Sequence, residues 1–548
     1  MMNPAVRRLP LMQVARRHPL IVGLIVAFVG ASAALAALWP ASGHADWMPF
    51  WFPVPSEDSY ILYRYSQHLS DGYGIVWNIG APPVDGSTDF LWMLLLSAWA
   101  AVFGAVIPGN YILGVLFAIV AASAGYVALR ALRRPLWPGR AFALLVLVSP
   151  MAYHILNGFG VPLYVALLGL DLTLFFVNTR PMGSPTSKRT SVWAVVMLLA
   201  GLARPEANIL NVSFLAASLL LSLRRRDMRL SQYWPVLVYY VLPGAAFLAF
   251  RLAYFGEVLP APFFVKSEFG ALPSLVLSNF GTYAIPTLIP CLLLAVPVFW
   301  NRKNEAFPVW LGALGAIFTL FGVYQLFSQD QNQSYRFEYP AYFLTLLVTM
   351  VSLGCSPFVR TRAMLVALGS LLFGWALYWA LMPVSGPSVD SRWPAGEMLR
   401  QYRGAGYTLA TTEAGAVPYI SEWRTLDTFG LNNYAVAHEG LTQDQWQSYA
   451  PALVLNHSTT ALEVPRLNDS GNRLELYERM RESGNYVPVA AVVVRKPLGF
   501  TRPNDYHIYF LRTDIPHFEE LAARLRQLPG QTYVEIPPEL TAYFRSHK

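Results

Sequence analysis

The chain has 548 residues, of which 55% are hydrophobic and 14% aromatic, and only 13% are charged. Because soluble domains carry about 25% charged residues, this composition excludes an ordinary soluble protein and predicts a chain that lies largely in lipid. The net charge of +8 forms no basic patch of the kind that binds nucleic acid. The two cysteines exclude a disulfide framework and, on that count, a zinc site.

Apolar runs close to the ~20 residues needed to cross a bilayer recur through the first part of the chain. Clusters of Lys and Arg separate them, and such clusters stay in the cytoplasm when loops are short. This rule predicts about eleven transmembrane helices that start from a cytoplasmic N-terminus. The expected spans are residues 20–39, 111–130, 141–156, 161–179, 192–204, 207–223, 233–252, 283–300, 307–327, 339–355 and 363–383.

The apolar run at residues 90–107 does not fit this path, because a crossing there would invert every later basic cluster. A twelfth span is the alternative. We expect instead a helix that lies on the outer leaflet or dips into it. It belongs to a first periplasmic loop that covers residues 40–110.

The composition becomes polar after Met382, which predicts two domains: a transmembrane domain at 1–383 and a periplasmic α/β domain at 384–548. Strands and amphipathic helices alternate in the second domain. The expected strands are 407–412, 452–456, 487–495 and 507–512, and the expected helices are 393–403, 473–483 and 518–528.

Five basic residues of the first domain fall outside the cytoplasmic clusters: Arg64, Arg204, Arg251, Lys266 and Arg336. All are expected at or near the periplasmic face, where cations oppose the insertion bias. A lipid-linked phosphate at the outer leaflet would compensate them. Pairing with nearby acidic residues is the alternative, and both can hold at once.

Two adjacent carboxylates, Glu57 and Asp58, stand at the predicted membrane boundary, where charge is costly unless it is paired or used. A carboxylate there could take a proton from an acceptor hydroxyl. An acid pair that caps a helix is the alternative. The two residues could also hold a divalent metal, although no acidic cluster has a spacing that demands one. We therefore predict no metal site.

Taken in order, these segments resemble the GT-C superfamily of membrane glycosyltransferases that use polyprenyl-phosphate sugars. They resemble more narrowly its arabinofuranosyltransferase-like branch, which includes the mycobacterial enzyme that adds terminal β-(1→2)-arabinofuranose. The most distinctive piece is Thr412–Tyr419, followed by Arg424–Asp427 and Gly430–Asn432. The resemblance also covers residues 57–92, 203–207, 251–266 and 330–340.

The resemblance implies the catalytic residues, and the charge and expected position of other residues indicate the ligands. Asp58 takes the catalytic place, with Glu57 beside it. The expected ligands of the donor phosphate are Arg64, Lys266, Arg336 and Arg204, and the expected ligands of sugar or acceptor are Glu206, Asp330, Tyr335 and Glu413. Two departures concern the sugar. The chain has Ser328-Gln329-Asp330 where relatives often have Gly-Gly-Asp, and Gly158-Phe159-Gly160 where they often have Gly-Leu-Glu.

The expectation is therefore an enzyme of the bacterial inner membrane with its active site in the periplasm. It would move a sugar, arabinofuranose by the resemblance, from a polyprenyl-phosphate donor to a glycan or protein acceptor, with no certain cofactor. One alternative is a transporter or flippase of lipid-linked sugars. Another is a polymerase or ligase that uses diphosphate-linked oligosaccharides.

Overall fold

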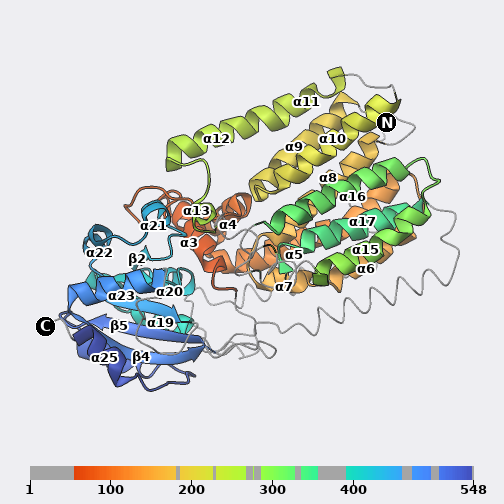
Figure 1. Cartoon of the computed structure of the whole chain (residues 1–548). Helices are drawn as coiled ribbons and strands as arrows, with labels where there is room; N and C mark the ends of the chain where they lie inside the picture. Colours follow the sequence, from red (N-terminus) through yellow and green to blue (C-terminus); the bar gives the residue numbers. More distant parts are fainter. Residues whose placement is uncertain are drawn as a thin grey trace, which may run out of the picture.

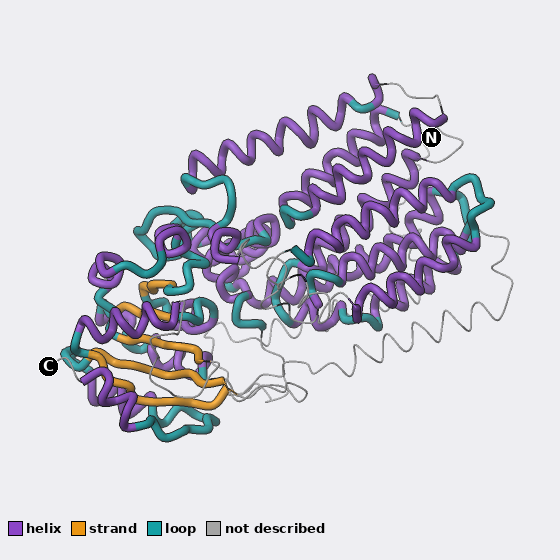
Figure 2. Tube along the Cα trace, viewed as in Figure 1, coloured by secondary structure: helices purple, strands orange, loops and turns teal. Residues whose placement is uncertain are grey.

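The computed structural model describes residues 55–179, 186–225, 230–266, 276, 285–326, 332, 335–355, 391–458, 472–494 and 505–545. A helical bundle and a domain with a β-sheet lie at opposite ends of the molecule (Figure 1). The strands all lie in the second part, and helices make up the first (Figure 2). Helices α3 (Ser59–Ser70) and α4 (Phe90–Phe103) lie at the junction of the two parts with the loops beside them, and so does α13 (Ala261–Lys266) (Figure 1).

The bundle follows the predicted apolar runs. Its elements are α3 (Ser59–Ser70), α4 (Phe90–Phe103), α5 (Val106–Ala131), α6 (Trp137–Leu147), α7 (Met151–Leu156), α8 (Val161–Thr179), α9 (Ser187–Ala203), α10 (Ala207–Arg225), α11 (Trp234–Val236), a π-helical turn (Leu237–Val241), α12 (Leu242–Phe255), α13 (Ala261–Lys266), α15 (Ile285–Trp300), α16 (Phe307–Tyr324) and α17 (Tyr339–Gly354). Among the described residues, five helices are long and apolar enough to span a membrane, and four shorter apolar helices accompany them. The chain is a multi-pass membrane protein.

The described residues do not support the predicted count of about eleven spans. The run at 141–156 divides at Pro150 into α6 and α7, which have 11 and 6 residues and are each too short to cross as a single span. A proline removes a backbone donor and clashes with the preceding turn, so an apolar run that contains one is a poor measure of helix length. The spans predicted at 20–39 and 363–383 lie outside the described residues.

The run at 90–107 forms a helix, α4, but a short one. It has 14 residues and ends at Gly104, whose φ of 81° terminates the helix in the left-handed conformation. An apolar helix of this length is typical of interfacial or packed segments rather than of a full crossing. The placement of α4 at the membrane surface stays a prediction.

The C-terminal part is a mixed α/β domain, as predicted. Its sheet has the order β2-β1-β3-β5-β4, in which β1 pairs in parallel with β2 and β3, and β5 pairs in antiparallel fashion with β3 and β4. The strands are β1 (Thr408–Thr411), β2 (Arg424–Asp427), β3 (Leu453–Ser458), β4 (Tyr486–Val494) and β5 (Asp505–Arg512). The helices are α19 (Arg392–Arg400), α20 (Ala416–Ser421), α21 (Tyr434–Glu439), α22 (Gln443–Tyr449), α23 (Asn472–Ser483), α24 (Phe518–Leu525) and α25 (Pro538–Arg545).

Successive strand residues bury themselves on opposite faces of this sheet, as a period of two requires. Leu409 and Leu453 belong to the core on one face, whereas Ala410 and Val454 belong to the core on the other. Strand β2 was not among the predicted strands. It has only four residues, and its first, Arg424, is exposed, so its apolar signal is short.

Arg64 joins the bundle to the sheet domain. Its guanidinium is buried and donates to the backbone oxygens of Trp77 (2.8 Å), Trp423 (2.9 Å) and Pro418, and to the side chain of Asn78 (3.2 Å). Burial lowers the pKa of Arg64 to about 10, so the side chain remains charged at neutral pH. One cation thereby satisfies carbonyl groups from two segments that are more than 300 residues apart.

We expect Arg64→Gln to loosen this junction. The variant removes charged hydrogen bonds, each worth about 1.5–3 kcal/mol, and leaves buried carbonyls unpaired, so we expect a loss of about 3 kcal/mol or more. Thermal unfolding in detergent measures it. Arg403→Gln is the control, because Arg403 is exposed and pairs with the exposed Glu422. Equal melting temperatures for the two variants would contradict the assignment.

Candidate functional site

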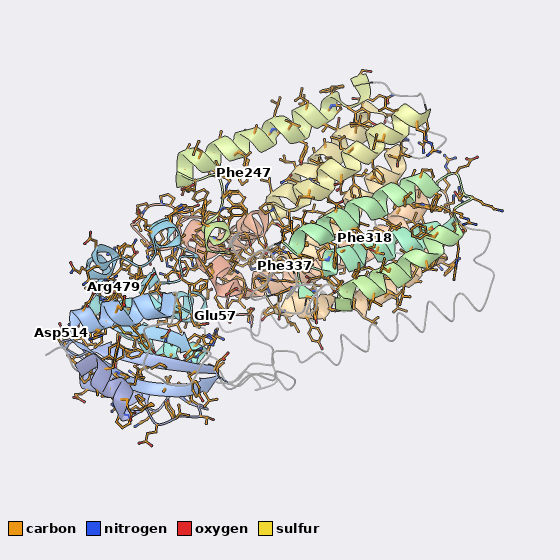
Figure 3. The ribbon with its side chains drawn as sticks, viewed as in Figure 1. Glu57, Phe247, Phe318, Phe337, Arg479 and Asp514 are labelled. Atoms are coloured by element: carbon orange, nitrogen blue, oxygen red, sulfur yellow. The ribbon has the colours of Figure 1, made fainter. Side chains whose placement is uncertain are left out.

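A small pocket at the junction of bundle and sheet domain collects three of the predicted site residues. Asp58, Lys266 and Arg336 line it together, although they come from the start of α3, the end of α13 and the turn before α17. Figure 3 labels Glu57, which precedes Asp58 in the chain, and Phe337, which follows Arg336, and both lie in this region. The remaining lining residues are Ile61, Leu62, Gly86, Ser87, Thr88, Asp89, Phe159, Pro262 and Leu431.

The adjacent carboxylates Glu57 and Asp58 have different surroundings. Glu57 accepts hydrogen bonds from the backbone amides of Gly415 (2.7 Å) and Ala416 (3.0 Å) in the sheet domain, and it lies 3.6 Å from Arg392. Asp58 occupies the position before α3, yet its side chain does not cap the helix. The alternative prediction, that this acid pair caps α3, is therefore wrong. Glu57 holds the sheet domain, and Asp58 lines the pocket.

Arg336 is a buried cation whose side chain makes few hydrogen bonds to the described residues. Its side chain lies over the ring of Phe159, 3.7 Å from the ring centre. Among the described residues, neither Nε nor Nη1 has a hydrogen-bond partner. Burial lowers the pKa of Arg336 to about 10, and Arg204 contributes in the same direction. Buried donors that make no hydrogen bond are costly, so Nε and Nη1 stand out among the described residues of the pocket.

A strained turn presents Arg336. Tyr335 has a φ of 55°, in the left-handed region that aromatic residues rarely adopt. Asn332 closes the turn: its side chain accepts from the Phe337 amide (3.2 Å) and donates to Glu338 (2.7 Å). The turn thus determines where the side chain of Arg336 enters the pocket, and Tyr335 contributes through its backbone conformation.

Arg204 lies behind the pocket and is held by Asp89. Its Nε donates to Asp89 at 2.9 Å and lies 3.5 Å from Glu206, whose carboxylate also accepts from the Tyr324 hydroxyl at 3.1 Å. Nη1 of Arg204 has no hydrogen-bond partner in the described part of the chain. The predicted residues Arg204 and Glu206 are therefore together, but neither lines the pocket. Arg204 and Arg336 lie over the ring of the same residue, Phe337, at 5.3 and 5.0 Å from its centre.

Asp89 is a site residue that the sequence reading missed. It lines the pocket at 1% exposure and accepts from the backbone amide of Gly160 at 3.1 Å. A Cβ at Gly160 would lie 2.8 Å from Trp92 and 3.4 Å from Asp89, so a glutamate would not fit there. The carboxylate that contacts Arg204 at 2.9 Å is that of Asp89. A polar residue directly before an apolar helix was the signal that could have identified it.

The sheet domain contributes one wall of the pocket through Leu431. Asp427 organises the turn that carries Leu431, because its carboxylate accepts from the amides of Phe429 (2.9 Å), Gly430 (3.2 Å) and Asn432 (2.8 Å). The distinctive sequence Arg424–Asp427 with Gly430–Asn432 thus builds a turn that closes the pocket.

The other predicted residues lie elsewhere. The donors of Arg64 are engaged by carbonyls and by Asn78, and Arg64 lines a separate cavity of about 440 Å³ between α3 and the sheet domain, so we no longer assign it to the donor phosphate. Glu413 pairs with Arg392 and His457 in a polar cluster of the sheet domain. Asp330 lies outside the described residues.

Comparison with solved structures shows a shared fold. The crystal structure of ArnT from Cupriavidus metallidurans bound to undecaprenyl phosphate matches 89% of this chain and 98% of its own, with a TM-score of 0.52 and 13% identity. The chain therefore has the fold of ArnT. The archaeal oligosaccharyltransferase AglB from Archaeoglobus fulgidus, in complex with an inhibitory peptide and a dolichol-phosphate, covers 96% of this chain and 77% of its own at 12% identity, but its TM-score of 0.45 does not establish a shared fold.

Sequence comparisons add little. Residues 388–509 match a family described as a domain of unknown function (DUF8728), which is less than a quarter of the chain. None of the curated proteins matches the chain. At 13% identity the ArnT likeness concerns the fold alone.

We expect Glu57→Gln to weaken the docking of the sheet domain. The amide keeps the shape of the side chain but replaces charged hydrogen bonds by neutral ones, which lowers stability by about 1–2 kcal/mol. The melting temperature in detergent reports the change. Glu422→Gln is the control, since its carboxylate is exposed and pairs with Arg400 and Arg403 at the surface. An unchanged melting temperature for Glu57→Gln would contradict the docking role.

Proposed function

We propose that this protein is a membrane glycosyltransferase that takes its sugar from a lipid-phosphate donor. The observation that carries the proposal is the pocket in which the carboxylate of Asp58 shares walls with two cations, Lys266 and Arg336. A carboxylate and a phosphate-binding pair side by side are the groups that glycosyl transfer from a phosphate carrier requires. The fold shared with ArnT supports the same conclusion.

The cations would bind the leaving group. As the bond between the anomeric carbon and the phosphate oxygen breaks, negative charge builds on the phosphate. Arg336 offers buried N–H groups that have no hydrogen-bond partner among the described residues, and Lys266 offers a second charge on the same pocket. Arg204, oriented by Asp89, adds positive potential from behind. Asp89 and Glu206 limit the repulsion among these cations.

Asp58 would act on the acceptor. If the anomeric configuration inverts, its carboxylate takes the proton of the acceptor hydroxyl while that oxygen bonds to the anomeric carbon and the phosphate departs. If the configuration is retained, Asp58 acts as a nucleophile or stabilises an ion pair instead. In both cases the carboxylate must be ionised and near the sugar. Glu57 is engaged by backbone amides and so leaves this task to Asp58.

The finer assignments rest on the resemblance of the sequence to the arabinofuranosyltransferase-like branch. We propose polyprenyl-phospho-arabinofuranose as the donor, with a decaprenyl or undecaprenyl chain, and a glycan or protein as the acceptor. The ArnT protein, which has the same fold, was crystallised with undecaprenyl phosphate, and this supports a carrier of that class. We propose, from the charge rule for loops, that the pocket and the sheet domain lie on the periplasmic side of the inner membrane.

The described charges favour transfer over transport. A transporter places its polar site near the bilayer midplane, between repeats of the fold. Here the charged residues gather at the junction with the sheet domain, and that domain supplies Leu431 to the pocket wall. A polymerase or ligase acting on diphosphate-linked oligosaccharides would use the same location, so the donor must be identified by assay.

We expect Asp58→Asn to lose transfer by ~10²-fold or more, because the amide cannot accept the proton. The assay uses the purified full chain in nanodiscs with decaprenyl-phospho-arabinofuranose and an arabinan or peptide acceptor, and counts the sugar transferred. Asp71→Asn is the matched control, because Asp71 is an exposed carboxylate at the other end of α3.

Two outcomes would overturn the proposal. A folded Asp58→Asn variant that transfers sugar as fast as wild type would remove Asp58 from the mechanism. A wild-type protein that binds the lipid yet transfers nothing to any acceptor would favour the transporter. Transfer from a diphosphate-linked oligosaccharide but not from the monophosphate donor would identify the polymerase or ligase.

We expect Arg336→Gln to lower the rate of sugar transfer without lowering the stability of the protein. The loss of a preorganised donor to the phosphate should reduce transfer by ~10²–10³-fold. The same change removes a buried charge whose Nε and Nη1 have no hydrogen-bond partner among the described residues, so the melting temperature without lipid should stay the same or rise. Arg336→Lys should keep part of the activity, since it keeps the charge but not the fork of donors. A variant that loses activity and stability together would indicate a structural role instead.

A further inference from the structure

A second cluster of polar side chains lies in the sheet domain, away from the pocket. Glu413, His457 and His507 each offer a metal-ligating atom, and these atoms all lie within 4.8 Å of one another. Asp505 adjoins them, with its carboxylate 3.2 Å from Nε2 of His457. We propose that this cluster is a binding site for a divalent transition-metal cation of the zinc type.

The topology of the sheet brings these residues to one edge. Strands β1 and β3 are parallel, so Glu413, which follows β1, and His457, near the end of β3, lie at the same edge. Strand β5 runs the other way, and the register pairs His507 directly with His457. Opposed residues of an antiparallel pair are among the closest neighbours in a sheet, so the two imidazoles share one face.

The distances suit a small cation. Two ligand atoms that are each about 2.0–2.2 Å from zinc at a tetrahedral angle lie roughly 3.3 Å apart. Glu413 and His457 are in direct contact, and all three ligand atoms lie within 4.8 Å, so small side-chain rotations would close them around an ion. Two imidazoles with carboxylates favour zinc over calcium or magnesium, which prefer oxygen. The cysteine count, which excluded a zinc site in the sequence, excludes only thiolate sites.

Outer contacts orient His507 for this role. The fully buried ring interacts through Nδ1 with the Ser391 hydroxyl at 2.9 Å, and the Tyr509 hydroxyl donates to Ser391 at 2.7 Å. Metal-ligating histidines characteristically have their second nitrogen held in this way. The chain of hydroxyls therefore assigns Nε2 of His507 as its ligating atom.

The local charge also favours a cation. Three carboxylates gather here, Glu413, Asp505 and Glu57, and Arg392 is the guanidinium that pairs with both Glu413 and Glu57. A divalent ion bound by Glu413 and His457 would neutralise these carboxylates further.

The site would brace the docking of the sheet domain. Glu413 is two residues before Gly415, whose amide holds Glu57. An ion on Glu413 would therefore fix the segment that clamps the residue next to Asp58. This role is structural and does not depend on which reaction the pocket performs.

The test measures metal directly on the full chain in detergent, prepared without a polyhistidine tag. Wild-type protein is equilibrated with zinc chloride, desalted and analysed by mass spectrometry for the metal. We expect about one zinc per chain, and about tenfold or more weaker zinc binding in His457→Gln and in Glu413→Gln. X-ray absorption should give nitrogen and oxygen neighbours near 2.0–2.1 Å, with the signature of imidazole.

The control is His438→Gln, which alters a histidine of the same domain that lies beside Glu257 and outside the cluster, and should bind zinc as wild type does. His507→Gln is a second variant, but His507 is fully buried, so the part-exposed His457 decides if that variant does not fold. Wild-type protein that retains no zinc, or a folded His457→Gln variant that binds it with unchanged affinity, would overturn the proposal. Neither result would bear on sugar transfer by the pocket.

Discussion

The need to compensate buried carboxylates in the segment after Pro55 determines how the rest of the molecule is assembled. A carboxylate removed from water is stable only when a cation or several donors reach it. Here each partner comes from a distant part of the chain, so satisfying the charge also positions an element. The pairs are Asp85 with Arg251 of α12 at 2.5 Å, Asp89 with Arg204 between α9 and α10 at 2.9 Å, and Glu57 with the amides of Gly415 and Ala416 in the sheet domain. Bundle and sheet domain therefore meet around this one segment.

The adjacent residues Glu57 and Asp58 make different contacts in this segment. Glu57 has its charge neutralised by backbone amides, and that contact holds the sheet domain in place. Asp58 borders the pocket instead, where the cations Lys266 and Arg336 are also found. Nε and Nη1 of the buried Arg336 have no hydrogen-bond partner among the described residues, and leaving buried donors unbonded costs stability. The distribution of paired and uncompensated charge thus separates the residues that build the junction from those suited to chemistry.

The sheet domain takes part in the pocket rather than only sitting beside it. Its turn at Asp427–Asn432 supplies Leu431 to the wall, and the start of α20 supplies the amides that hold Glu57. Arg64 fastens the same interface by donating to carbonyls on both sides. Among its described residues, the domain also carries a polar cluster at the edge of β1, β3 and β5, where Glu413, His457 and His507 lie close together.

The sequence by itself determined the membrane class, most of the apolar helices and the α/β character of the C-terminal part, because composition and apolar periodicity are local properties. It also singled out Asp58, Lys266 and Arg336, since charges at a membrane boundary are rare enough to stand out. Only the tertiary structure decided that Arg64 and Glu57 serve the interface, that Asp89 supplies the carboxylate beside Arg204, and that His457 faces His507. These contacts form between segments that are far apart in the chain. They could not be predicted from the sequence because a local pattern does not indicate which distant residue will neutralise a given charge.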